Sequence, residues 1–415
     1  MQRIILNLAL AAVVFGPGAA AQTSADEALD HARELLGRTP LIDGHNDLPL
    51  TIRNFEEAPM DVIAYDLSER TPDDTDLPRL REGQVGAQFW SVYISPDRAA
   101  EEGYAKWQLE QIDIAHRMIE RYPDTLELAI TADDIERIFA AGKIASLLGM
   151  EGGYGIENSL GALRSYYRLG VRYMTLTHRK THDWADSAND TPRHEGLSAF
   201  GEEVVREMNR LGMLIDLSHV SPRTMHDVLD VSEAPVIFSH SSAYALTKNV
   251  RNVPDDVLKR MRENGGIVMV TFIPEFVSEE VRTWREARDA YVEMSMLDEH
   301  AEGSLRERYA NEYGPVPEAT LADVADHIEY VRDVAGIDHV AIGSDYYASG
   351  DMPVGLEDVS TFPHLIAELV RRGWSDRELR KLIGENALRT LRDAEKVAAG
   401  LQRSRPASTI IFDEP

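Results

Sequence analysis

Eight short apolar segments separated by helical patterns constrain the fold of this chain more than any other feature. They cover residues 40–43, 86–94, 144–150, 173–177, 213–218, 235–239, 266–272 and 339–343. Most of them are almost continuously aliphatic, with little alternation of apolar and polar residues, and this is typical of parallel strands covered on both faces. We therefore expect eight buried parallel strands.

The segments between these strands carry recognisable helix ends. Ser221 and Pro222 suit the N-cap and first position of a helix, and the acidic start of residues 254–264 is followed by Gly265 as a helix stop. Strand and helix thus alternate along the chain. Eight such units favour an α/β fold with a single (β/α)8 barrel of the TIM type, and a doubly wound open sheet is the alternative.

Two segments are longer than ordinary connections. Residues 53–85 form a polar excursion after the first strand, and residues 274–327 form a charged, helix-prone insertion between strands seven and eight. A chain of 415 residues can hold both within one barrel domain. Loops at the carboxyl ends of barrel strands build active sites, so the insertion is a lid, a dimer surface or a solvated helical decoration.

Residues 1–21 have the layout of a secretory signal peptide. Arg3 precedes an apolar run, and Ala19, Ala20 and Ala21 supply the small residues of a cleavage site. The run is short for a membrane span, although a retained anchor is the alternative. We expect cleavage near Ala21, a mature barrel domain over 22–415, a periplasmic or secreted location, and no stable membrane anchor.

The cysteine content and the net charge narrow the chemistry. The chain has no cysteine, so it can use neither disulfides nor thiolate ligands, and any metal must be held by His, Asp and Glu. A formal charge of −28 argues against binding of nucleic-acid phosphates or an anionic membrane surface. The expected partner is a small molecule.

Ionisable residues follow six of the eight strands. In a barrel, functional side chains lie just beyond the carboxyl ends of the strands. A single histidine there is commonly structural, but a set of four histidines and three acids at one end of the barrel indicates a metal site. In chain order the residues are His45, Asp47, Glu151, His178, His219, His240 and Asp345.

The spacing and types of these residues suggest more than one metal ion. His45 and Asp47 are two residues apart and would point to the same side of a strand. Nitrogen and oxygen ligands without sulfur suit zinc, and also cobalt, manganese or iron. His45 and Asp47, together with Glu151, His219 and His240, are more ligands than one catalytic zinc needs. Two ions about 3.5–4 Å apart that share a carboxylate and a hydroxide would use all five. Glu151 lies between the two pairs in strand order and is the expected bridge.

With these residues the chain resembles the renal or membrane dipeptidases, the M19 metallopeptidases, over about residues 39–392. The resemblance rests on several motifs that follow one another in order. They are "DGHNDLPL", "LREGQVGAQFWSVY", "GMEGG", "GVRYMTLTH" with "WADS", "GLSAFGEEVVREMNRLGMLIDLSHVS", "FSHSSA", "RNVPDD" and "IGSDY". The lack of cysteine separates this chain from the lipid-anchored, disulfide-linked animal members and suggests a bacterial exported form.

The resemblance implies a binuclear zinc dipeptidase. His45 and Asp47 match the ligands of one zinc, His219 and His240 match those of the other, and Glu151 matches the bridging glutamate. The family also implies cleavage of L-Xaa-D-Xaa as well as L-Xaa-L-Xaa dipeptides, and a homodimer is a common assembly among its members.

The resemblance also implies roles around the substrate. Asp345 matches the catalytic aspartate, His178 matches a histidine that contacts the substrate, and Arg251 matches the arginine that holds its free carboxylate. After "GSD" the family often continues with Phe, Asp and Gly, whereas this chain has Tyr346, Tyr347 and Ala348. We expect this divergent loop, beginning with Tyr346, to border the substrate.

Other functions remain as alternatives. An N-acyl-amino-acid deacylase or a β-lactam hydrolase would use the same groups, and a substrate panel would separate them from a dipeptidase. A zinc-binding barrel without catalysis would bind metal and cleave no dipeptide. A phosphotriesterase-like site usually opens with His-x-His, whereas this chain has His45-x-Asp47.

Overall fold

The predicted strands close into one parallel barrel. In the computed structural model, which describes residues 17–295 and 302–413, the first strand pairs with the second on one side and with the last on the other. This closure confirms the (β/α)8 prediction, and the open-sheet alternative is wrong. The barrel strands are β1 (Leu41–Asn46), β2 (Val85–Ser91), β4 (Ile144–Glu151), β5 (Val171–Thr175), β6 (Leu214–Asp216), β7 (Ile237–Phe238), β8 (Ile267–Val270) and β9 (Val340–Ile342).

One further strand, β3 (Leu126–Leu128), was not expected from the sequence. It pairs with the first residues of β4, Ile144 to Ser146, whereas β5 pairs with the last four residues of β4. β3 thus pairs with the start of β4, which β5 leaves unpaired. A segment of three residues, "LEL", carries too little pattern to be recognised as a strand.

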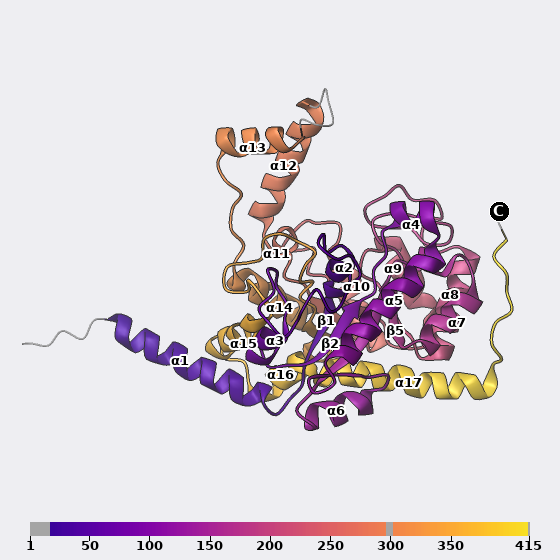
Figure 1. Cartoon of the computed structure of the whole chain (residues 1–415), viewed down its shortest axis with the longest axis horizontal. Helices are drawn as coiled ribbons and strands as arrows, with labels where there is room; N and C mark the ends of the chain where they lie inside the picture. Colours follow the sequence, from indigo (N-terminus) through magenta and orange to yellow (C-terminus); the bar gives the residue numbers. More distant parts are fainter. Residues whose placement is uncertain (1–16, 296–301, 414–415) are drawn as a thin grey trace, which may run out of the picture.

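The helices surround the barrel in the expected alternation (Figure 1). They are α1 (Pro17–Leu36), α2 (Leu48–Arg53), α3 (Leu77–Glu82), α4 (Pro96–Glu102), α5 (Tyr104–Arg121), α6 (Ala132–Ala140), α7 (Leu160–Arg168), α8 (Ala199–Leu211), α9 (Pro222–Val231), α10 (Asp255–Asn264), α11 (Pro274–Val277), α12 (Glu279–Ser295), α13 (Glu302–Tyr313), α14 (Leu321–Ala335), α15 (Phe362–Arg371), α16 (Asp376–Arg380) and α17 (Asn386–Ser404). Short single turns are η1 (Gly153–Ile156), η3 (Ile337–His339), η4 (Val359–Thr361) and η5 (Lys381–Glu385).

The predicted helix ends are present. The Ser221 hydroxyl accepts a hydrogen bond from the backbone N–H of Thr224, and Pro222 is the first residue of α9. Helix α10 ends at Asn264 and is capped by Gly265, whose φ of 82° is the left-handed conformation that glycine adopts most easily.

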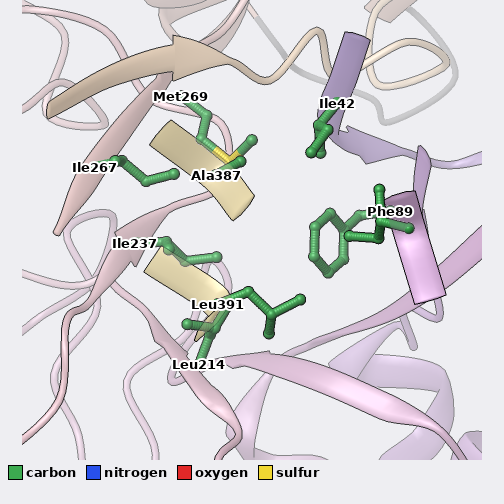
Figure 2. A pocket seen from close by; sticks show the side chains of 9 residues that line it. Ile42, Phe89, Leu214, Ile237, Ile267, Met269, Ala387 and Leu391 are labelled. Atoms are coloured by element: carbon green, nitrogen blue, oxygen red, sulfur yellow. The ribbon is translucent and has the colours of Figure 1, made fainter. Parts of the chain in front are cut away.

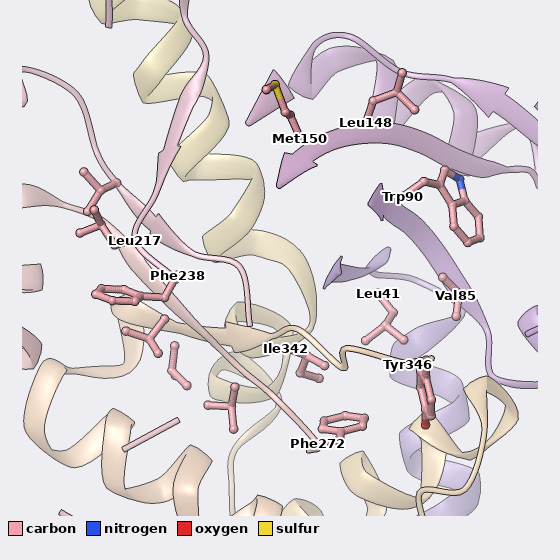
Figure 3. Close-up of a cluster of buried hydrophobic side chains, with 14 of the residues drawn as sticks. Leu41, Val85, Trp90, Leu148, Met150, Leu217, Phe238, Phe272, Ile342 and Tyr346 are labelled. Atoms are coloured by element: carbon pink, nitrogen blue, oxygen red, sulfur yellow. The ribbon is translucent and has the colours of Figure 1, made fainter. Parts of the chain in front are cut away.

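The hydrophobic core has two layers. Inside the barrel, Ile42, Phe89, Leu214 and Met269 point toward one another, and α17 closes the amino-terminal end with Ala387 and Leu391 (Figure 2). Outside the barrel, side chains such as Leu41, Trp90, Leu148 and Phe238 pack between the strands and the surrounding helices (Figure 3). The opposite, carboxyl-terminal end of the barrel remains for the polar side chains.

The insertion between the last two strands is helical, as predicted. Helices α12 and α13 project away from the barrel (Figure 1), whereas the following α14 buries Val324, Ile328 and Val331 against it. The predicted insertion, residues 274–327, therefore combines a projecting pair of helices with the start of a regular barrel helix.

The amino-terminal segment lies only partly within the described residues. Residues 1–16 of the predicted signal peptide are outside them, and residues 17–21 belong to α1, so the signal peptide stays a prediction. Farther along α1, Ala28, Ala32 and Leu36 are buried, and this helix lies beside α15. Among the described helices, none has the length and apolar character needed to cross a membrane.

Candidate metal centre

The carboxyl end of the barrel gathers six of the seven predicted side chains into one buried cluster. Within the described residues, three overlapping groups of possible metal ligands occur there, each with its ligand atoms within 4.8 Å of one another. All six residues are buried. The groups are His45 with Asp47 and Glu151, Glu151 with His219 and His240, and His45 with His240 and Asp345.

Glu151 stands between the two sides of this cluster. Its Oε2 lies 3.6 Å from Nε2 of His45, whereas its Oε1 lies 2.8 Å from Nε2 of His219 and 3.4 Å from Nε2 of His240. On the first side, Asp47 Oδ1 lies 3.5 Å from the same His45 nitrogen. One carboxylate thus offers a separate oxygen to each pair of ligands.

The convergence of His45 and Asp47 has a different cause from the expected strand alternation. Strand β1 contains a bulge: three steps from Asp43 to Asn46 run beside only two steps from Gln88 to Trp90 in β2. Asp47 lies beyond the strand, at the start of α2, with φ −88° and ψ 19°. The turn into α2 therefore brings its carboxylate back toward His45.

Two members of the cluster have unusual backbone conformations. His219 has a φ of 70° and Asp345 a φ of 66°, both in the left-handed region that residues with a Cβ rarely adopt. Backbone hydrogen bonds hold them there, from Asp345 N to His45 O and from Ala188 N to His219 O. Such conformations cost about 1–3 kcal/mol each and cluster at functional sites.

The electrostatics of the cluster are those of a site built for cations. Burial raises the pKa of Glu151 and of Asp345 well above the usual range, and the charge of Asp47 adds to this effect. Burial lowers the pKa of His45, but the surrounding carboxylates, Glu151 first, outweigh it and raise that pKa to about 10. Burial lowers the pKa of His219 and of His240 well below its usual value. Divalent ions would relieve the repulsion between these carboxylates.

Buried atoms of the cluster that lack hydrogen-bond partners are also suited to bind metal ions. Among the described residues, His45 Nε2 and Asp47 Oδ1 are buried and make no hydrogen bond. Nε2 of His219 and Nε2 of His240 lie 2.9 Å apart. If both nitrogens carried lone pairs, they would repel each other at this distance unless a cation lay beside them. Buried polar atoms without partners are costly, and metal coordination would satisfy them.

A cavity of about 640 Å³ opens above the cluster. Asp47, Glu151, His219, His240 and Asp345 form its floor, and His178 and Arg251 line it as well. A ligand in this cavity would therefore touch the cluster directly.

His178 lies on the rim of the cluster. Its Nε2 is 4.0 Å from Glu151 Oε1, and its ring lies between those of Tyr93 and His219, with centroid distances of 4.6 Å and 4.4 Å. Burial lowers the pKa of His178 well below its usual value. A neutral His178 can donate one hydrogen bond into the cavity.

Arg251 reaches the cavity from the loop after β7. Only 4% of it is exposed, Nη2 donates to the backbone carbonyl of His240 at 3.4 Å, and the guanidinium lies 5.3 Å from the ring centre of Phe276. Among the described residues, Nη1 has no hydrogen-bond partner. Burial lowers the pKa of Arg251 to about 10, so the group is still a cation at neutral pH. A buried cation with a free donor suits an anionic ligand.

The structure does not bring Tyr346 to the cavity. Its side chain is fully buried, and its hydroxyl donates to the backbone carbonyl of Asp358 at 2.8 Å, away from the cluster. Tyr347 and Ala348 line the cavity instead. Asp345 and Tyr347, on either side of Tyr346, have φ values of 66° and 75°, so this turn does not follow the side-chain alternation of an extended segment.

Several cavity residues were not expected from the sequence. Tyr93 and Asn189 come from the loops after β2 and β5, and Glu275, Phe276 and Arg285 come from α11 and α12. The charged insertion was the available signal for the last three, since a lid was one interpretation of it. Their individual positions depend on the tertiary fold.

Comparisons with known proteins agree with this geometry. The family model for membrane dipeptidases, peptidase family M19, matches residues 29–405. Dipeptidase verJ of Clonostachys rogersoniana is 42% identical over 389 residues, which cover 91% of this chain and 90% of that protein.

Solved structures give the same result. The probable dipeptidase PvdM from Pseudomonas aeruginosa superposes with a TM-score of 0.78 at 26% identity, over 90% of this chain and 100% of that one. A metallo peptidase from Rhodobacter sphaeroides, liganded with a phosphinate mimic of the dipeptide L-Ala-D-Ala, gives a TM-score of 0.69 at 25% identity, over 86% of this chain and 99% of that one. The fold, the buried ligand cluster and these relatives agree that the chain belongs to peptidase family M19, the membrane dipeptidase family, and is a metallodipeptidase.

Proposed function

We propose that this metallodipeptidase binds two zinc ions and hydrolyses both L-Xaa-D-Xaa and L-Xaa-L-Xaa dipeptides. The observation that carries the proposal is the position of Glu151, whose two oxygens face two different sets of ligand atoms. His45 and Asp47 would hold one ion, His219 and His240 the other, and Glu151 would bridge them together with a hydroxide.

The surrounding residues supply the acid–base chemistry. Two zinc ions bound here would polarise the scissile carbonyl and provide hydroxide at neutral pH. Asp345, which lines the cavity, accepts the remaining proton of the attacking hydroxide and then donates it to the leaving amine. His178 donates a hydrogen bond to the oxygen on which negative charge develops.

Arg251 accounts for the restriction to dipeptides. Arg251 lines the cavity, its Nη1 has no hydrogen-bond partner among the described residues, and the guanidinium can bind the terminal carboxylate of the substrate. A longer peptide would place a neutral amide there and leave a buried cation unpaired, which is unfavourable.

The stereochemical part of the proposal draws on a relative. The Rhodobacter sphaeroides metallo peptidase was solved with a mimic of L-Ala-D-Ala. We therefore expect this chain to accept a D-residue at the C-terminal position.

The first experiment is L-Ala-D-Ala hydrolysis by the purified protein before and after metal removal, with zinc, cobalt and manganese returned separately. We expect the activity to disappear, to return with zinc, and to require two zinc ions per chain. Full activity with one ion would contradict the binuclear site. Cleavage of L-Ala-L-Ala without cleavage of any L,D-dipeptide would contradict the stereochemical part.

Export is part of the proposal. We expect the mature chain to begin near Gln22 in the periplasm or the medium, and mass spectrometry of the N-terminal peptide from each fraction tests this. A chain that keeps residues 1–21 would contradict a cleaved signal peptide.

A further inference from the structure

Two of the ligand histidines are held from behind by hydrogen bonds that fix which ring nitrogen carries the proton. The first is His45, whose Nδ1 lies 2.7 Å from the hydroxyl oxygen of Tyr173. That hydroxyl donates its single hydrogen to the backbone carbonyl of Gly44 at 3.2 Å, so it accepts a hydrogen bond from Nδ1–H of His45. A proton is thus held on Nδ1, and Nε2, which faces Asp47 and Glu151, is the nitrogen that would lose its proton when a metal ion binds.

The second is His240, which is backed by a serine and a carboxylate. Nδ1 of His240 lies 2.8 Å from Oγ of Ser239, and this hydroxyl donates to Oδ2 of Asp216 at 2.6 Å. Oδ2 also accepts from the hydroxyl of Thr175 at 2.5 Å, and Oδ1 accepts from the backbone N–H groups of Ser218 and Ser239. With four donors around it, Asp216 acts only as an acceptor, so the serine in turn accepts from Nδ1–H of His240.

The packing shows that these supports are built into the barrel. Tyr173 and Asp216 are completely buried. Gly149 of β4 leaves the space that the Tyr173 ring occupies, because a Cβ at that position would lie 2.0 Å from its Cζ. By contrast, Nδ1 of His219 has no partner among the described residues.

We infer that Tyr173 and the Asp216–Ser239 pair are positioning residues that hold His45 and His240 with a proton on Nδ1, so that Nε2 is the nitrogen of each ring that binds metal. The inference rests on the proposed metal centre. Partners of this kind orient ligand histidines and increase their basicity, and their loss typically weakens metal binding about 10- to 100-fold.

The sharpest test is Asp216→Asn. The amide oxygen can replace Oδ1 toward the two backbone N–H groups, whereas the amide NH₂ replaces Oδ2 and donates to Ser239. The serine hydrogen would then turn to Nδ1 of His240 and move the imidazole proton to Nε2, where it blocks coordination. We expect zinc affinity at one of the two sites to fall at least about 10-fold, as measured by competition with a chelator and metal analysis.

A double variant separates this effect from damage to the fold. Adding Ser239→Ala to Asp216→Asn removes the hydroxyl that would drive the proton to Nε2, so zinc should bind more tightly to the double variant than to Asp216→Asn alone. Equal or weaker binding by the double variant would overturn the inference. A purely structural role predicts that the second substitution adds to the damage.

Thr175→Val is the matched control for Ser239→Ala. Each removes one hydroxyl from the same oxygen of Asp216, but only Ser239 contacts His240. We expect Ser239→Ala, and likewise Tyr173→Phe, to weaken zinc binding about 10-fold or more, and Thr175→Val to change it less than about twofold. Equal losses in Ser239→Ala and Thr175→Val would overturn the inference, as would no loss in Ser239→Ala. Failure of the unmodified protein to bind two zinc ions would instead refute the proposed metal centre.

Discussion

At the scale of single residues, Asp345 could serve either as a proton carrier or as a metal ligand. Its Oδ1 lies 3.9 Å from Nε2 of His45, and it also falls within one group of possible ligands together with His240. The proposed function assigns it to proton transfer, so its replacement should separate binding from chemistry.

Asp345→Asn keeps the size of the side chain and removes its ability to carry a proton. We expect turnover of L-Ala-D-Ala to fall about 10²- to 10⁴-fold, because that is the usual contribution of a positioned acid–base group. Metal analysis should still find two ions per chain. Loss of an ion from this variant would show that Asp345 is mainly a ligand.

Arg251 is tested with a pair of substrates. Arg251→Met removes the charge but keeps a long side chain, so the preference for a dipeptide with a free carboxylate over the same dipeptide amide should disappear. We expect kcat/KM for the free dipeptide to fall about 10²-fold or more, since a buried charge pair lost on one side costs about 2–5 kcal/mol. An unchanged preference for the free carboxylate would exclude this role.

The sequence allowed residue-scale prediction where the backbone left little choice. Residues just beyond parallel barrel strands must lie at one end, so His45, Glu151, His219 and His240 could be placed together before any coordinates were known. The position of Tyr346 could not be predicted, because the residues on either side of it, Asp345 and Tyr347, both have left-handed backbone that the sequence does not reveal. Nor could Tyr173 and Asp216, since buried strand residues give no sequence signal for the histidine that they support.

At the scale of elements, α14 holds the loop that carries Arg251. His327 of α14 accepts a hydrogen bond from the backbone N–H of Ala243 at Nδ1, and its Nε2 lies 3.2 Å from the hydroxyl of Thr247. The imidazole must be neutral to accept at Nδ1, and burial lowers the pKa of His327 to about 4. Protonation of His327 would place two N–H groups against each other.

This contact makes stability depend on pH. Because the folded pKa lies below the unfolded value of 6.5, the unfolded chain binds the extra proton first, and stability is lost as the pH falls from about 6.5 toward 4. We expect the free energy of unfolding to fall between pH 7.5 and pH 5 by about 2 kcal/mol more than in His327→Asn, which keeps an acceptor but does not titrate. Urea unfolding at the two pH values measures the difference, and parallel losses in both proteins would contradict it.

Helix α12 contributes to the cavity wall through Arg285. This side chain pairs with Glu275 of α11 and, at 2.7 Å, with Asp351 of the loop after β9. The insertion and that loop are thus joined at the edge of the cavity.

Arg285→Gln should weaken the contact of α12 with α11 and with the loop after β9, and it should leave the ligand cluster unchanged. We expect KM for L-Ala-D-Ala to rise by about 10-fold or less, the effect of losing part of one hydrogen-bonded ion pair, with kcat nearly unchanged. Arg282→Gln is the control, because Arg282 lies on the same helix and pairs with Glu279 and Glu286 but does not line the cavity. An equal rise in KM in the control would mean that the helix, and not the ion pair, shapes the wall.

Most elements could be predicted because the apolar runs of the strands were nearly continuous and the helix ends carried capping residues such as Ser221 and Gly265. The failures were β3, whose three residues are too few to show a period, and the division of residues 274–327. Gly314, Pro315 and Pro317 mark the break between α13 and α14 in the sequence, but nothing in the sequence shows that α13 projects and α14 packs, since only the barrel surface determines this.

At the scale of the whole molecule, the net charge of −28 should influence how substrates arrive. A dipeptide with neutral side chains has no net charge, whereas L-Ala-D-Glu carries an extra negative charge that the protein repels at long range. We expect kcat/KM for L-Ala-D-Glu to rise several-fold between 10 and 200 mM salt, and that for L-Ala-D-Ala to stay nearly constant. A fall with salt would show that Arg179, Lys180 and Arg251 around the cavity dominate the field instead.

The left-handed backbone at His219 and Asp345 also affects how this protein can evolve. Glycine or asparagine would relax either position, so these substitutions, which would destroy catalysis, should make the chain easier to fold. Mutation without selection for activity would then lead to more stable barrels that no longer cleave dipeptides. Inactive descendants of this fold should therefore arise readily and persist. Their first substitutions are expected at the two strained residues.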